Sequence, residues 1–324
     1  MGNSKNKPAV FITRQIPEAG INLLREKNYK VKVYKSDQPI PKNELIKNIK
    51  TADAVIPLLT DKFDAAVIDK MQNCKIIANY AVGFNNIDIN YAKKKNIYVS
   101  NTPDVLTDST ADLAIALTLA CARRLVEAEK FINAKKFKGW KPKLLLGVEL
   151  KDKIFGILGA GRIGTATALR VKAFGTKIVY FSNNKNEFLE ENTDAKRVSL
   201  NSLLKNSDFI SIHLPLNKKT FHLLNKEKLN LIKNTAIIVN TARGEVIDER
   251  ELIRLLKKRK IKCAGLDVFE NEPELNSEFF KLDNVVILPH IGSGTEEARD
   301  KMALLAAKNV ISVLSGKRPI TPVN

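Results

Sequence analysis

The chain has 324 residues, of which 44% are hydrophobic and 27% charged, and its formal net charge is +19 at pH 7. This balance is typical of a soluble globular protein, excludes a wholly disordered or membrane-embedded chain, and leaves room for two domains with separate cores. The lysines are scattered in short groups such as "YAKKKN" and "LLKKRKIK", with no stripe of arginine and aromatic residues that would stack bases, so we expect a solvated basic surface and no nucleic-acid partner.

The N-terminal segment contains no recognisable targeting signal. The apolar run 9–12 is too short for the core of a signal peptide. Gly2 invites a myristoylation check, but that signal requires Ser or Thr where the chain has Asn6. The longest apolar stretch, 111–122, is too short to span a bilayer and contains Asp112, so we expect a buried helix there and no membrane partner.

The cysteines indicate the redox compartment. Cys74, Cys121 and Cys263 are far apart in the sequence, so they suggest neither a disulfide framework nor a thiolate metal site. We therefore expect no metal and a reducing, cytoplasmic location.

Ten short apolar runs, separated by stretches of helical periodicity, predict β-strands. They lie at 9–13, 29–34, 52–57, 75–80, 153–158, 177–181, 208–213, 236–240, 262–268 and 285–289. Runs that are apolar nearly throughout are typical of strands covered on both faces, and their alternation with helices predicts an α/β fold of doubly wound parallel sheets.

Two helical stretches indicate the domain organisation. The stretch 107–134 separates four strand runs from six, and the stretch 295–316 follows the last strand. We expect a discontinuous substrate-binding, flavodoxin-like domain formed by residues 1–101 and 293–324. Residues 102–292 would form a dinucleotide-binding Rossmann domain.

The stretch "GILGAGRIGTATALR" carries the most specific signal. Gly159, Gly161 and Gly164 form a G-x-G-x-x-G pattern directly after a predicted strand and at the start of a predicted helix. The first glycine permits a tight turn, the second lets a pyrophosphate approach the backbone, and the third lets the helix pack on the strand. Exposed amides at the helix N-terminus would face the phosphates, so we expect a bound dinucleotide.

The next strand bears on the choice of cofactor. An NAD-selective site has a carboxylate at its end, but this chain has Ser182 there and no acid until Glu187. Ser182, Asn183 and Lys185 could donate hydrogen bonds to a 2′-phosphate, so NADP is admissible beside NAD. The absence of an arginine in this turn leaves the preference open.

Polar residues that follow predicted strands are candidates for catalysis, because ligands bind at the carboxyl ends of parallel strands. Arg243, Glu272 and His290 each follow such a run. A guanidinium would bind the carboxylate and carbonyl oxygen of a 2-oxo acid, and an imidazole supported by a carboxylate would protonate that oxygen. By position alone His213 competes equally with His290, while His222 lies in a polar connection.

Several long motifs together resemble one family, the D-isomer-specific 2-hydroxyacid dehydrogenases. They are "YAVGFNNID", "NTPDVLTDSTADLAIALTLACARRL", "GILGAGRIG", "HLPL", "NTARGEVIDE", "GLDVFENEP" and "LPHIGSGT", and they cover almost the whole chain. Within the family the chain looks most like the glyoxylate and hydroxypyruvate reductases, through "NTPDVLTDSTADLA", "GWKPKLLLGVEL" and "YFSNN".

The resemblance implies roles for individual residues. Arg243, Glu272 and His290 match the catalytic arginine, glutamate and proton-donating histidine, which favours His290 over His213. The amides near Val82 and Gly83 would bind the substrate carboxylate. The cofactor would be lined by Thr110, Gly159, Ala160, Gly161, Arg162, Ile163, Gly164, Ser182, Asn183, Asn184, Thr241, Ala242, Arg243 and Asp267.

The resemblance also implies a homodimer formed through the dinucleotide domain, with Trp140 in an arm at the interface. One departure concerns the cofactor, because related reductases often have Ser-Arg where this chain has Ser182 and Asn183.

We expect a cytoplasmic homodimeric reductase that transfers hydride from NADH or NADPH to C2 of glyoxylate or hydroxypyruvate in a cleft between the domains. The alternatives are a dehydrogenase for another D-2-hydroxy acid, such as D-lactate or 3-phosphoglycerate, and a dinucleotide-sensing corepressor-like binding protein. The missing regulatory domain argues against a phosphoglycerate enzyme, and the complete catalytic trio argues against a binding protein.

Overall fold

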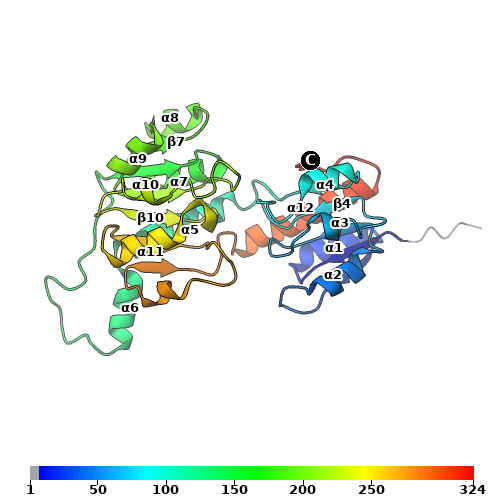
Figure 1. Ribbon diagram of the computed structural model, residues 1–324, viewed down its shortest axis with the longest axis horizontal. Coiled ribbons are helices and arrows are strands. Elements are labelled where there is room, and N and C mark those ends of the chain that lie inside the picture. Colours follow the sequence, from blue (N-terminus) through cyan, green and yellow to red (C-terminus); the bar gives the residue numbers. More distant parts are fainter. Residues whose placement is uncertain (1–6) are drawn as a thin grey trace, which may run out of the picture. The chain divides into compact units, whose positions relative to one another are not determined.

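The computed structural model describes residues 7–324, so Gly2 and Asn6 of the myristoylation pattern lie outside the described residues. The chain divides into two compact units (Figure 1). Unit 1 comprises Met1–Leu106 and Ser293–Asn324, and unit 2 comprises Thr107–Gly292.

Unit 1 is built on a parallel sheet of five strands in the order β2-β1-β3-β4-β5. The strands are β1 (Ala9–Ile12), β2 (Lys30–Val33), β3 (Ala54–Ile56), β4 (Ile76–Ala78) and β5 (Tyr98–Ser100). The helices are α1 (Glu18–Glu26), α2 (Lys42–Ile49), α3 (Ala65–Ile68), α4 (Ile89–Lys94) and α12 (Glu296–Leu314). Helix α12 packs against α1, β3 and β4, which ties the C-terminal segment into this unit.

Unit 2 is built on a parallel sheet of seven strands in the order β12-β11-β10-β9-β6-β7-β8. The strands are β6 (Ile154–Leu158), β7 (Lys177–Phe181), β8 (Lys196–Arg197), β9 (Phe209–Ile212), β10 (Ile237–Asn240), β11 (Cys263–Leu266) and β12 (Val285–Ile287).

The helices of unit 2 are α5 (Thr107–Ala122), α6 (Leu125–Asn133), α7 (Arg162–Lys172), α8 (Glu187–Thr193), α9 (Leu200–Asn206), α10 (Lys226–Leu229) and α11 (Glu249–Lys257), with 3-10 turns η1 (Gly244–Val246) and η2 (Ser277–Lys281). Two parallel sheets with helices confirm the predicted fold class.

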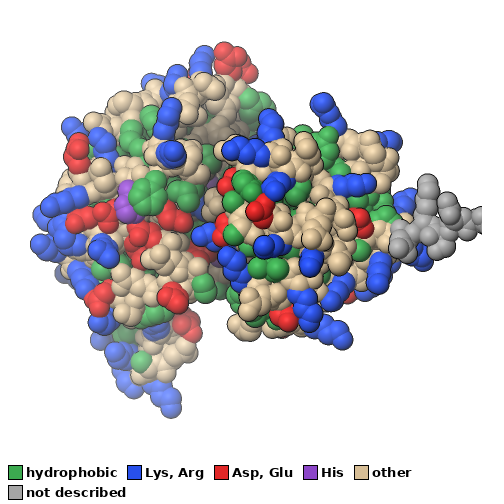
Figure 2. Space-filling model, turned by 45° about the vertical axis from the view of Figure 1, so that its right-hand side comes forward, with side chains coloured by type: hydrophobic (Ala, Val, Ile, Leu, Met, Phe, Trp, Pro, Cys, Tyr) green, Lys and Arg blue, Asp and Glu red, His purple; other side chains and the backbone are tan. Residues whose placement is uncertain are grey.

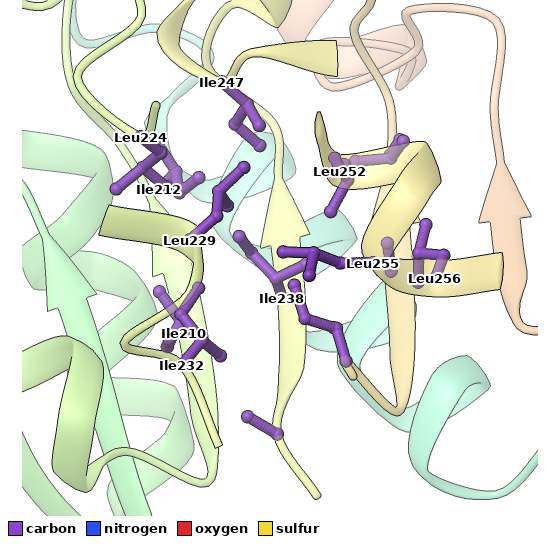
Figure 3. Packing of buried hydrophobic residues seen from close by; sticks show 14 of the residues in the cluster. Ile210, Ile212, Leu224, Leu229, Ile232, Ile238, Ile247, Leu252, Leu255 and Leu256 are labelled. Carbon is purple, nitrogen blue, oxygen red and sulfur yellow. The ribbon is translucent and has the colours of Figure 1, made fainter. Parts of the chain in front are cut away.

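The central strands of unit 2 are covered on both faces, as their apolar sequences predict. Along β10, Ile238 points into one hydrophobic cluster while Ile237 and Val239 point into the other. Figure 3 shows the first cluster, where Leu252, Leu255 and Leu256 from α11 pack over β9 and β10, together with further labelled residues: Ile210, Ile212, Leu224, Leu229, Ile232, Ile238 and Ile247. This packing fixes the carboxyl ends of these strands.

Two strands were missed by the sequence prediction. Strand β5 has three residues, and β8 has only Lys196 and Arg197, both exposed. Neither produces a run of buried apolar residues, because β5 is short and β8 is a polar edge strand. Residues 7–324 thus form sheets of five and seven strands where four and six runs were expected.

The stretch 107–134 is two helices, since α5 ends at Ala122 and α6 begins after Arg124, whose φ is +55°. None of the residues of α6 is buried, and the segment after it contains Trp140, which is 83% exposed. Helix α6 and this segment extend away from the sheet of unit 2 (Figure 1).

Two further observations concern the surface. No helix among residues 7–324 is long and apolar enough to cross a membrane. Lysine and arginine side chains are spread over the face shown in Figure 2, with acidic side chains among them.

Candidate active site

The carboxyl edge of the unit 2 sheet gathers most of the candidate residues. All strands of this sheet run parallel, so the loops that follow β6, β7, β10, β11 and β12 lie along the same edge. These loops carry the glycine turn, Ser182, Arg243, Glu272 and His290.

Glu272 and His290 form a direct pair. Nδ1 of His290 lies 2.6 Å from Oε2 of Glu272, and both side chains are about one quarter exposed. The other carboxylate oxygen of Glu272 accepts a 2.9 Å hydrogen bond from the amide of Phe269. Glu272 is therefore held by its own turn, and it orients the imidazole so that Nε2 is the nitrogen left to meet a substrate.

The backbone of His290 is held in an unusual conformation. Its φ is +54°, in the left-handed region that residues other than glycine rarely adopt. The buried carboxylate of Asp267 accepts hydrogen bonds from the next two amides, of Ile291 (2.7 Å) and Gly292 (2.8 Å). These bonds hold the turn, and the hydroxyl of Thr110 adds a bond to the carbonyl of Gly292.

Burial raises the pKa of Asp267, while the two amides and His290 oppose that shift. Thr110 and Asp267 were predicted to line the cofactor. In the structure they also anchor the turn that carries His290, and a role toward the cofactor stays a prediction.

Arg243 follows β10 in a turn shaped by Asn240. The side chain of Asn240 accepts from the amide of Ala242 (3.0 Å) and donates to the carbonyl of Arg243 (2.8 Å). Desolvation lowers the pKa of the Arg243 guanidinium, whereas the negative charges of Glu272 and Glu245 raise it. Arg243 therefore lies within the electrostatic reach of the Glu272 carboxylate and stays a cation near neutral pH.

Gly244 explains how closely two turns approach. A Cβ atom on this residue would overlap the backbone of Phe269 and the amide of Glu270. The turn that carries Arg243 is thus pressed against the turn that carries Glu272, and only glycine fits between them.

The glycine turn has the geometry of a phosphate cradle. Gly159 has a φ of +97°, and a side chain on Gly164 would overlap the carbonyl of Gly159. Gly161 is the N-cap of α7 and has no side chain to cover the first amides of the helix, and the space beside it is open. Amides of the first turn are thereby available to an anion.

A buried hydroxyl group also supports an anionic dinucleotide site at this edge of the sheet. Oγ1 of Thr241, at the carboxyl end of β10, is buried and has no hydrogen-bond partner among the described residues. An unsatisfied buried polar atom at a ligand-binding edge fits a site that a dinucleotide completes.

An arginine that the sequence reasoning missed lies beside the segment after β7. Arg197, on β8, donates to the carbonyls of Ser182 (3.0 and 3.2 Å) and Asn183 (2.6 Å). Asn186 ties this segment to the glycine turn through Ala160 and Thr165. A guanidinium thus lies beside Ser182 although the turn itself contains none, and the pairing of β7 with β8 places it there.

The other two histidines lie outside the Glu272 pair. Nε2 of His213 lies 2.9 Å from the Ser211 hydroxyl, and desolvation lowers the pKa of this ring to about 3. His213 is therefore neutral near pH 7 and poorly suited to donate a proton. Nε2 of His222 lies 2.8 Å from Oε1 of Glu270.

In unit 1, asparagines hold the loop that carries Val82 and Gly83. Asn101 donates to the carbonyl of Val82 (2.8 Å), and Asn79 donates to that of Gly83 (2.8 Å). Asn86, in turn, bonds to Asn79. These three asparagines orient the peptide groups of the loop, and sequence reasoning did not identify them.

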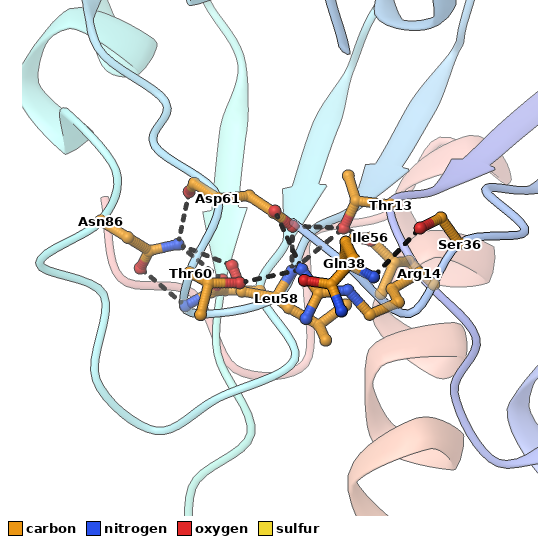
Figure 4. A network of polar contacts seen from close by, with 10 residues as sticks. Thr13, Arg14, Ser36, Gln38, Ile56, Leu58, Thr60, Asp61 and Asn86 are labelled. Carbon is orange, nitrogen blue, oxygen red and sulfur yellow. Dashed lines mark hydrogen bonds and ion pairs between the residues drawn. The ribbon is translucent and has the colours of Figure 1, made fainter. Parts of the chain in front are cut away.

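A polar network lies beside this loop (Figure 4). Asn86 donates to the carbonyls of Leu58 and Asp61, and the buried Asp61 carboxylate accepts from Thr13 and from the amide of Leu58. Burial raises the pKa of Asp61, and its hydrogen bonds and Arg14 oppose that shift. The network braces the loops after β1, β3 and β4 against one another.

Comparisons with known proteins agree with this geometry. Residues 115–292 match the model of the D-isomer specific 2-hydroxyacid dehydrogenase, NAD binding domain. A glyoxylate reductase of Thermococcus litoralis is 51% identical over 322 residues, which cover 98% of this chain and 97% of the relative.

Solved structures agree over similar lengths. A glyoxylate reductase from Paecilomyes thermophila superposes with a TM-score of 0.88 at 32% identity, covering 98% of each chain. An NADPH-dependent glyoxylate/hydroxypyruvate reductase from Sinorhizobium meliloti, crystallised with NADP and malonate, superposes with a TM-score of 0.87 at 28% identity, covering 98% of this chain and 97% of the other. The chain belongs to the D-isomer-specific 2-hydroxyacid dehydrogenase family.

Proposed function

We propose that the chain reduces a small 2-oxo acid to the D-2-hydroxy acid, with glyoxylate (to glycolate) and hydroxypyruvate (to D-glycerate) as its substrates. The observation that carries this proposal is the His290–Glu272 pair, 2.6 Å apart, because the turn of Glu272 lies directly against the turn that carries Arg243. Relatives about half identical over nearly the whole chain are named glyoxylate reductases, which supports this choice of substrate.

Each member of the trio has a distinct task. Arg243 holds the substrate carboxylate and carbonyl oxygen with parallel hydrogen bonds and polarises the carbonyl. NADH or NADPH, when held at the glycine turn, would supply the hydride that C2 receives. His290 gives the proton from Nε2 to the carbonyl oxygen, which becomes the new hydroxyl, and Glu272 orients the ring through Nδ1.

Val82 and Gly83 complete the proposed binding of the substrate. Their amides would donate to the substrate carboxylate, and Asn79 and Asn101 fix the peptide groups of this loop. Backbone amides suit a small substrate, because glyoxylate offers little apolar surface to bury.

Arg197 supports NADPH as the better cofactor. Its guanidinium lies at the Ser182–Asn183 turn, where a 2′-phosphate would meet it together with the Ser182 hydroxyl. We expect Arg197→Ala to reduce kcat/KM with NADPH about tenfold, the size of one lost charge-assisted hydrogen bond, and to leave NADH little affected. Equal losses with both cofactors would argue for a purely structural role.

A panel of small 2-oxo acids, each assayed with NADH and with NADPH, tests the proposed function. Glyoxylate and hydroxypyruvate should give the highest kcat/KM. Higher values with pyruvate or 3-phosphohydroxypyruvate would favour another member of the family. Binding of the cofactor without turnover of any acid would favour a binding protein.

We also propose a cytoplasmic homodimer formed by unit 2. Helix α6 and the segment after it expose several large apolar side chains that a partner copy would cover, namely Leu125, Ile132, Phe137, Trp140 and Leu146. Sedimentation of the wild type should give twice the monomer mass, and Phe137→Ser with Trp140→Ser should shift it to the monomer. The three cysteines are free and buried, which fits a reducing compartment.

A further inference from the structure

Unit 2 contains a second histidine–glutamate pair with no part in hydride or proton transfer. Nε2 of His222 lies 2.8 Å from Oε1 of Glu270, and the two side chains are 33% and 20% exposed. Glu270 stands two residues before Glu272 in the same turn. The ring of Phe221 stacks on the imidazole, with centroids 4.2 Å apart.

Glu270 also holds the start of α11. Its Oε1 accepts a 2.9 Å hydrogen bond from the amide of Glu249, and the carboxylate of Glu249 accepts one of 3.1 Å from the amide of Glu270. The two residues therefore fasten each other's backbone. Burial and the nearby Glu270 raise the pKa of Glu249.

The segment that carries His222 is bonded to the turn that follows Arg243. The amide of His222 donates to the carbonyl of Glu245 (2.8 Å), and that of Leu224 donates to Val246 (3.0 Å). Gly244 in turn lies directly against the backbone of Phe269 and Glu270. Three segments, 221–224, 243–249 and 269–272, thus meet at the Glu270 carboxylate.

We propose that His222 and Glu270 are positioning residues that hold the turn of Arg243 against the turn of Glu272. The inference rests on the proposed function, because it assigns the His222–Glu270 pair a task in aligning the side chains of Arg243 and Glu272 for a 2-oxo acid. Small displacements of catalytic groups have large effects on rate. Loss of the His222–Glu270 pair, which joins both turns, should therefore lower the turnover rate.

A structural role alone predicts something different. Partly exposed polar pairs contribute little to stability, so removal of His222 should shift the melting temperature by less than about 3 °C. If the His222–Glu270 pair positions the two turns, kcat/KM should fall strongly although the melting temperature changes little.

The experiment compares His222→Leu, which removes the hydrogen bond, with His222→Gln, whose amide can restore it. We expect His222→Leu to lower kcat/KM for glyoxylate about tenfold, with a higher KM for glyoxylate and an unchanged KM for the cofactor. His222→Gln should recover most of this loss. Hydrogen exchange should speed up in peptides that cover 243–249 and 269–272 only in the leucine variant.

A matched control is Lys233→Met. Lys233 pairs with Asp208 at 2.9 Å with similar exposure, 34% and 24%, but the pair lies before β9 and β10, at the amino edge of the same sheet. This variant should keep wild-type kcat/KM and wild-type exchange in both peptides.

Two outcomes would overturn the inference: wild-type kinetics and exchange in His222→Leu, or equal losses in the leucine and glutamine variants. A wild-type protein that reduces no 2-oxo acid would instead refute the proposed function. In that case the exchange of the two peptides alone decides whether His222 joins the turns.

Discussion

Two histidine–glutamate pairs share the turn 269–272 of unit 2. They are exposed to a similar degree, but they differ in the ring nitrogen that meets the carboxylate. His290 and Glu272 are 26% and 23% exposed, and His222 and Glu270 are 33% and 20% exposed. His290 is bound through Nδ1, so its outer nitrogen remains for a substrate. His222 is bound through that outer nitrogen, to a carboxylate that also anchors backbone. We propose that the choice of ring nitrogen separates the proton donor from the positioning residue.

Removal of the proposed proton donor, His290, should have the largest effect on activity. We expect His290→Asn to lower kcat for glyoxylate by about 10²- to 10⁴-fold, the usual contribution of a general acid, with the affinity for the cofactor nearly unchanged. Steady-state kinetics and cofactor titration measure both. His213→Asn is the control, since that ring is neutral near pH 7, and a larger loss for His213 than for His290 would reverse the assignment.

Separation of the two turns should have the next largest effect. Gly244→Ala places a methyl group into the backbone of Phe269 and Glu270. Overpacking of this kind costs about 1–3 kcal/mol in the free energy of unfolding, and activity should fall because the turn of Arg243 must move. Urea denaturation measures the first effect. Gly161→Ala, which enters open space, should cost less than about 1 kcal/mol, and equal costs would refute the close approach.

The third histidine, His213, belongs to neither pair, and it should make the stability of the protein depend on pH. The pKa of His213 is lowered to about 3 in the folded chain, below its ordinary value of 6.5. Between these two pH values the unfolded chain binds a proton at His213 and the folded chain does not. The free energy of unfolding therefore decreases as the pH falls from about 6.5 toward 3.

The slope for this one group is at most about 1.4 kcal/mol per pH unit. Urea denaturation at pH 7 and pH 5 should show a smaller loss for His213→Gln than for the wild type. A loss that is the same in both proteins would show that another group carries the effect.

Much of the fold follows from local sequence patterns. The runs that form β9, β10 and β11 are apolar nearly throughout because each strand is buried on both faces, and the glycine pattern after β6 requires a tight turn. Strand β8 could not be found in this way, since its two residues are exposed and pair only with the edge of the sheet.

The candidate site was less accessible to sequence reasoning where it depends on backbone contacts. The spacing of His213 and His290 leaves them equivalent. The structure separates them, because His290 pairs with Glu272 while desolvation lowers the pKa of His213. The bonds of Arg197 and Glu270 go to backbone groups of residues distant in the chain. No local pattern encodes such bonds, because tertiary packing sets which turn meets which.

The most direct test of the central claim is the turnover of Arg243→Ala, with glyoxylate as the varied substrate and with a parallel titration of NADPH. If this guanidinium grips and polarises the 2-oxo acid, kcat/KM should fall at least about a hundredfold, while the dissociation constant for NADPH and the melting temperature stay close to wild type. Turnover within a few-fold of wild type would contradict the account.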